Sequence, residues 1–129
     1  MRKQYHLRVS ERGRLVWDVH RLVELSAGLP RRDVPLSEIR ELDEPYWFVG
    51  DGDRPTCREV ADHARLMAET DLRYPIILAA DGRVMDGMHR VARAYIEGRD
   101  SVTAVRFEET PEPDYVDVDL DALPYDDAL

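Results

Sequence analysis

The fold is decided by residues 74–94, which read YPIILAADGRVMDGMHRVARA. The run from Tyr74 to Ala79 is continuously apolar, as in a strand that is buried on both faces. Asp81-Gly82 is a strong hairpin signal, so the chain is expected to return as a second strand. Asp86-Gly87 then turns the chain into a helix that begins at Met88. This stretch predicts a hairpin that leads through a tight turn directly into a helix.

Outside this stretch, the pattern predicts two further helices. One covers residues 11–28, because apolar residues recur there at helical spacing and Gly28 is followed by Pro30. The other begins after Thr56, which is followed by Glu59 at the spacing of a capping box. Its expected buried stripe consists of Val60, Ala64, Met67 and Leu72. The helix over 88–97 offers Val91, Ala92, Ala94 and Tyr95 for packing, and Gly98 ends it.

The remaining strands complete a small α+β fold. Residues 34–36 predict a short strand and residues 101–107 a final one, which gives a small mixed β-sheet with packed helices. Three segments are expected. They are an N-terminal helical segment (1–33), a core (34–107) and an acidic C-terminal arm (108–129) that is extended or disordered.

The net charge of −9 is concentrated in the arm. Nine of the 27 acidic residues lie in 108–129, where there is no Lys or Arg, and the other 18 balance the 18 basic residues of the body. Duplex DNA binding depends on basic contacts to phosphates, so this distribution disfavours direct DNA binding. An alternative use of the arm is to mimic nucleic acid toward a basic partner.

Cysteine content and hydropathy indicate a soluble protein. Cys57 is the single cysteine, so no disulfide can form within the chain. The N-terminal residues lack the apolar stretch of a signal peptide, and the longest apolar run has seven residues. We expect a cytoplasmic protein of bacterial type, with no membrane segment and no metal-ligand pattern of His and Cys. A homodimer or a protein partner is left open.

The turn at Asp86-Gly87 carries the chemistry. A glycine permits close backbone approach, and a helix start offers unpaired N–H groups and the positive end of the helix dipole. His89 and Arg90 in the first turn oppose that dipole, which makes sense when an anion lies over it. The alternative is that Asp86 caps the helix and Arg90 pairs with Asp86 or with a loop carboxylate. Local chemistry alone does not separate the two.

The block from Tyr74 to Ala94 resembles the signature of the ParB/sulfiredoxin superfamily. The matching features are Pro75 before an apolar strand, the hairpin at Asp81-Gly82, and Gly87 followed by His89 and Arg90. Residues 34–39 are similar to the first strand of these domains. The resemblance covers roughly residues 34–107 and implies a nucleotide-binding fold.

Three branches of that superfamily differ after the glycine. Sulfiredoxin carries a cysteine where this chain has Met88, whose thioether cannot act as a nucleophilic thiolate. The ParB partition proteins carry Glu-Arg-Arg and a DNA-binding domain. The chain is most similar to the free serine kinases, whose Asp-Gly-His-His-Arg motif matches Asp86, Gly87, His89 and Arg90 but departs at Met88.

This resemblance implies a set of site residues. Gly87, Met88, His89 and Arg90 would bind the phosphates of ATP, ADP or CTP, with Asp86 as a Mg²⁺ contact. A glutamate after the first strand would be the catalytic base, and Glu44 is favoured over Glu41. Tyr46 and Trp47 would stack on the base or the substrate.

The resulting hypothesis is a nucleotide-dependent phosphotransferase that acts on a small hydroxyl compound, in the manner of a serine kinase. The alternative is a non-catalytic module that binds a nucleotide or a protein partner.

Overall fold

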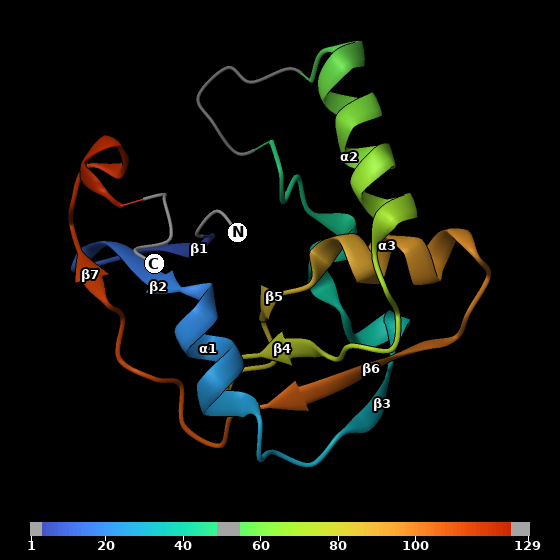
Figure 1. Cartoon of the computed structure of the whole chain (residues 1–129), viewed down its shortest axis with the longest axis horizontal. Helices are drawn as coiled ribbons and strands as arrows, with labels where there is room; N and C mark the ends of the chain where they lie inside the picture. The colour runs from blue at the N-terminus through green and yellow to red at the C-terminus, as the bar shows by residue number, and fades with distance from the viewer. Residues whose placement is uncertain (1–3, 49–54, 125–129) are drawn as a thin grey trace.

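The described residues form a small mixed α+β fold with three α-helices, as expected from the sequence, but with two sheets where the sequence predicted one (Figure 1). This computed structural model describes residues 4–48 and 55–124. The α-helices are α1 (Val19–Ser26), α2 (Cys57–Glu69) and α3 (Met88–Ile96), and the 3₁₀ turns are η1 (Leu36–Glu38), η2 (Arg40–Asp43) and η3 (Leu120–Ala122). The strands are β1 (Tyr5–Ser10), β2 (Gly13–Asp18), β3 (Arg32–Pro35), β4 (Ile76–Leu78), β5 (Val84–Asp86), β6 (Ser101–Arg106) and β7 (Tyr115–Val116).

The larger sheet has the order β3-β6-β4-β5, and its strand β4 is buried on both faces. Strands β4 and β6 run parallel, and the other two pairs are antiparallel. Successive residues of β4 point to opposite faces: Ile76 and Leu78 pack with α3, whereas Ile77 packs with Trp17 and α1. Two covered faces explain why the sequence of this strand is continuously apolar.

The hairpin and the following helix agree with the sequence-based expectation. The β4–β5 turn contains Gly82 with φ +86°, and Ala79 donates its backbone N–H to the carbonyl of Arg83. Helix α3 begins directly after Gly87, and Gly98 follows its end with φ +74°. Positive φ values at these glycines account for the strength of the sequence signal, because other residues pay a steric penalty there.

The predicted helix over 11–28 is wrong in its first half. Residues 13–18 form β2, which pairs with β1 around a tight turn, and α1 begins only at Val19. The Asp18 carboxylate accepts the His20 backbone N–H and caps this helix. Val16 and Trp17 are both buried, so their spacing fits a covered strand as well as a helix.

The C-terminal arm is extended, and the structure places residues 108–124 against the body. Strand β7 adds to β2 as the third strand of the small sheet, order β1-β2-β7. The Trp17 indole N–H donates to the carbonyl of Pro111 at 2.8 Å, and Leu123 is buried. Residues 101–107 are therefore not the last strand, and the small sheet joins the two ends of the described chain.

Helix α2 begins where the capping box predicts, but its expected buried stripe is wrong. The Thr56 hydroxyl oxygen accepts the Glu59 backbone N–H at 3.2 Å. No residue within α2 is buried, and Val60 is 51% exposed. The helix extends away from the larger sheet and rests on α3 alone among the α-helices (Figure 1). Tyr95 of α3, expected in the core, is likewise exposed. No helix among the described residues is long and apolar enough to cross a membrane.

Candidate functional site

The turn at Gly87 is held tightly between β4 and α3. Gly87 is the N-cap of α3 and adopts φ +103°, in the left-handed region. A Cβ at this position would lie 2.7 Å from Ile76 Cγ2 and 2.9 Å from Arg90 Nη1. Both the backbone conformation and the lack of space therefore require glycine.

Arg90 pairs within the body of the protein, as in the alternative interpretation of the turn. Its Nη1 donates to the Pro75 carbonyl at 2.7 Å, and its Nη2 lies 3.4 Å from Asp86 Oδ2. Asp86 does not cap the helix, since Gly87 is the N-cap and provides no side-chain cap. Burial raises the pKa of Asp86, while Arg90 and the Gly87 N–H act in the opposite direction. Arg90 thus ties the start of α3 to the end of β5 and to the residue that precedes β4.

His89 belongs to a ring cluster that the sequence did not reveal. His63 Nδ1 and His89 Nε2 are 2.8 Å apart, which joins α2 to the first turn of α3. Both imidazoles stack on Trp47, with ring centroids 4.4 Å and 4.6 Å away and interplanar angles of 18° and 14°. Desolvation, followed by the neighbouring His63, lowers the pKa of His89 to about 4. Trp47, expected to stack on a ligand, stacks here on the imidazoles of His63 and His89.

A cavity of about 560 Å³ runs along α3 and is called the helix-side cavity. Met88, Ala92 and Tyr95 form one wall at helical spacing. The opposite wall comes from residues 36–48, namely Leu36, Ser37, Glu41, Leu42, Asp43, Glu44, Pro45, Tyr46, Trp47 and Phe48. The cavity therefore reaches Met88, the first residue of α3, and is bordered by the aromatic residues Tyr46, Trp47 and Phe48.

A second cavity of about 350 Å³ is called the strand-side cavity. Its lining comes from β1, η2 and the β4–β5 hairpin, and comprises His6, Leu7, Arg8, Glu41, Glu44, Tyr46, Asp81, Arg83 and Val84. Glu41, Glu44 and Tyr46 line both cavities. Burial, then Glu41, raises the pKa of Tyr46 to about 12, so its hydroxyl stays protonated.

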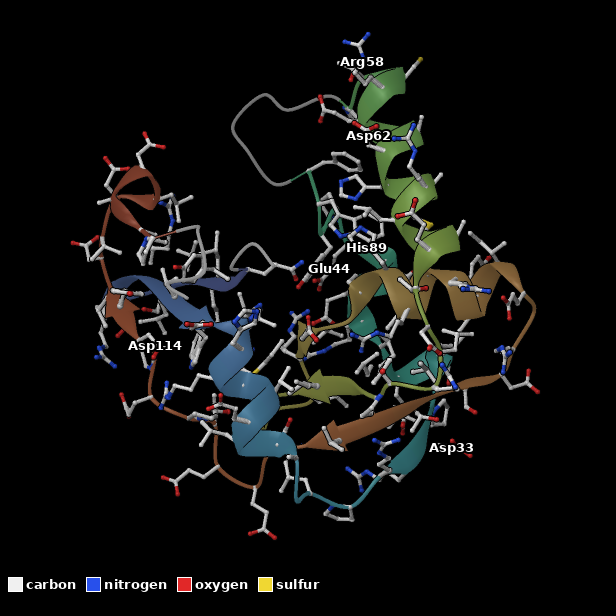
Figure 2. The ribbon with its side chains drawn as sticks, in the orientation of Figure 1. Asp33, Glu44, Arg58, Asp62, His89 and Asp114 are labelled. Atoms are coloured by element: carbon white, nitrogen blue, oxygen red, sulfur yellow. The ribbon has the colours of Figure 1, made fainter. Side chains whose placement is uncertain are left out.

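The two candidate glutamates differ sharply in environment. Glu41 lies in η2 and is only 4% exposed; its Oε2 accepts the Val84 N–H at 2.7 Å. Glu44 is exposed, and both its oxygens accept from Arg83 Nη1 at 2.8 Å. Figure 2 shows Glu44 in the centre of the view, between the small sheet and α3. Glu41 is thus a fixed, buried carboxylate whose Oε2 lies 3.8 Å from Arg83 Nη1, and Glu44 is the closer ion-pair partner of Arg83.

Magnesium fits the Asp86 position poorly. The Asp86 carboxylate accepts from the Gly87 N–H and faces Arg90, so its oxygens already have partners. Among the described residues, no cluster of three or more His, Cys, Asp or Glu side chains could hold a metal ion.

Comparison with models of protein families, with curated proteins and with solved structures gave no match for this chain.

The pH dependence of stability tests the burial of His6 in the strand-side cavity. Desolvation, then Arg8, lowers the pKa of His6 from 6.5 to about 4. Between these two pKa values the unfolded chain therefore binds more protons than the folded chain. The contribution of His6 to the free energy of unfolding is fully present above pH 6.5 and is lost as the pH falls toward 4. We expect a loss on the order of 1–3 kcal/mol from this group.

Denaturant unfolding of the wild-type and His6→Phe proteins across this pH range measures the effect. The substitution should flatten the acid limb, since phenylalanine keeps a ring against Trp17 but does not titrate. His20→Gln is the matched control, because His20 lies on α1 and does not line the cavity. Identical acid limbs for wild type and His6→Phe would contradict the assignment.

Proposed function

We propose that the protein binds a nucleotide in the helix-side cavity and transfers a phosphoryl group to a small hydroxyl compound in the strand-side cavity. The observation that carries this proposal is the position of Glu41 and Glu44, which line both cavities. A phosphotransferase needs a carboxylate between its two ligands, within reach of the attacking hydroxyl. The fold supplies one at this boundary.

The helix-side cavity suits a nucleotide. Leu42 and Phe48 give it apolar and aromatic walls for a base, and its path along α3 reaches Met88, the first helical residue. The first N–H groups of a helix have no partner within the helix and favour phosphate oxygens. We place the phosphates of ATP, ADP or CTP there, on the backbone N–H groups of Met88 and His89.

The geometry favours Glu41 as the base, whereas the sequence favoured Glu44. The Val84 N–H holds one oxygen of Glu41, and the other, Oε1, has no hydrogen-bond partner among the described residues. That oxygen would accept the hydroxyl proton while the hydroxyl oxygen attacks the terminal phosphorus and the bond to the leaving phosphate oxygen breaks. Arg83 holds Glu44 and leaves it less free for this role.

A non-catalytic nucleotide-binding module is the second candidate. The observation that favours it is that the charged groups near the turn are already paired, Arg90 with Asp86 and Arg83 with Glu44. Such pairs hold a site in one geometry without requiring a reaction.

Two measurements on the full chain separate these functions. Calorimetric titration with ATP, ADP and CTP in the presence of Mg²⁺ measures binding, and ³¹P NMR follows phosphoryl transfer to a panel of small hydroxyl compounds. We expect saturable nucleotide binding and a new phosphate ester. Binding without transfer to any acceptor would support the module instead. No nucleotide binding at millimolar concentration would overturn both.

A further inference from the structure

The strand-side cavity gathers every buried side-chain polar atom that lacks a hydrogen-bond partner in residues 4–48 and 55–124. These atoms are His6 Nε2, Arg8 Nη2 and Glu41 Oε1. His6 and Glu41 are only 7% and 4% exposed. A buried polar group without a partner loses the hydrogen bonds that it made to water, so three such groups around one cavity are costly unless a ligand satisfies them.

The three atoms require different hydrogen-bond partners. Arg8 Nη2 can only donate and Glu41 Oε1, as a carboxylate oxygen, can only accept, while the neutral His6 imidazole can do either through Nε2. A hydroxyl group both accepts and donates, so one hydroxyl can bridge Arg8 and Glu41.

The charge of the lining further limits the class of ligand that the cavity can bind. Arg8 and Arg83 are positive and Asp81, Glu41 and Glu44 are negative, which leaves the lining with a net charge of −1. His6 adds no charge near neutral pH, because burial holds its pKa at about 4. The excess negative charge favours a cation and opposes an anion.

We propose that the strand-side cavity binds a small organic ammonium compound that also carries a hydroxyl group, an amino alcohol. Its hydroxyl oxygen accepts from Arg8 Nη2 and its hydroxyl proton is donated to Glu41 Oε1. Its ammonium group donates to His6 Nε2 and balances the charge of the lining. The role of the amino alcohol as the phosphoryl acceptor rests on the proposed function. Its binding to the cavity does not require a nucleotide.

Strand β1 contributes His6 and Arg8 to the lining of the strand-side cavity. Arg8 Nη1 is fixed by Asp81 at 3.1 Å, and the His6 ring lies against Trp17 with centroids 5.5 Å apart. Both side chains are therefore held in place before a ligand binds, which lowers the entropic cost of binding.

The test is calorimetric titration of the nucleotide-free protein with ethanolamine. Ethylene glycol, ethylamine and glycolate are the comparison ligands, because they lack the charge, lack the hydroxyl, or carry the opposite charge. We expect saturable millimolar binding of ethanolamine and binding of the other three that is weaker by roughly tenfold or more, the scale of one charged hydrogen bond.

Variants locate the binding site. Glu41→Gln and His6→Phe should each weaken ethanolamine binding by roughly tenfold, on the same scale, whereas His20→Phe should leave it unchanged because His20 does not line the cavity. Melting temperatures check that each variant is folded.

Equal binding of ethanolamine and glycolate, or unchanged binding in both cavity variants, would overturn the proposal. Ethanolamine that binds without being phosphorylated would leave this site standing while the phosphotransferase fails. Phosphorylation of an acceptor without any ethanolamine binding would do the reverse.

Discussion

Replacing Gly87 by alanine is expected to lower the free energy of unfolding by about 2–4 kcal/mol. Part of the loss comes from the backbone, since φ is +103° and a side chain is strained there. The rest comes from the new methyl group, which would lie 2.7 Å from Ile76 Cγ2. Ile76 is completely buried in the larger sheet, so it has no room to move aside.

Gly98→Ala is the matched control for this prediction. Gly98 also has a positive φ, +74°, but a Cβ there would meet no atom within 4 Å. Its substitution should cost only the backbone term, about 1–2 kcal/mol. Denaturant unfolding at neutral pH compares the two. Equal losses would show that the contact with Ile76 contributes nothing.

Glu41→Gln is expected to reduce phosphoryl transfer by about 10²–10⁴-fold, the usual contribution of a positioned base. The amide oxygen can still accept the Val84 N–H, so the variant should fold, and nucleotide affinity should remain nearly unchanged because the proposed phosphate position is at the start of α3. Steady-state turnover and calorimetric titration of the same samples measure the two effects separately.

Two further substitutions serve as comparisons for Glu41→Gln. Glu44→Gln should reduce turnover less, because its carboxylate is already held by Arg83. Glu38→Gln is the control, since Glu38 is exposed and lines neither cavity. Turnover that falls more in Glu44→Gln than in Glu41→Gln would return the role of base to Glu44.

Local chemistry explains which parts of the fold could be predicted. The β4–β5 turn, the start of α3 and its end each depend on a glycine with positive φ, and the start of α2 on the hydroxyl of Thr56. These signals act within a few residues, so they can be read from the sequence. The β1–β2 hairpin was missed although Gly13 in its turn also has a positive φ, because the apolar spacing around Val16 and Trp17 fits a covered strand as well as a helix.

The same distinction applies to the candidate site. Gly87 was found from its neighbours in the sequence. The pairing of His89 with His63 spans 26 residues, and the hydrogen bond from Val84 to Glu41 spans 43. Neither leaves a local pattern, since each depends on how two distant segments pack. The sequence therefore located the turn but not the ring cluster or the buried carboxylate.

The small sheet has a consequence for the order in which the molecule is completed during synthesis. Strand β1, which carries His6 and Arg8, leaves the ribosome about a hundred residues before β7, which completes the same sheet. Pairing between such distant segments is slow to form, because a long loop must close before any contact is gained. A nascent chain that ends before residue 115 already contains the Gly87 turn but cannot form the complete three-stranded sheet. The sheet that contains this wall of the strand-side cavity is thus among the last parts of the described fold to form.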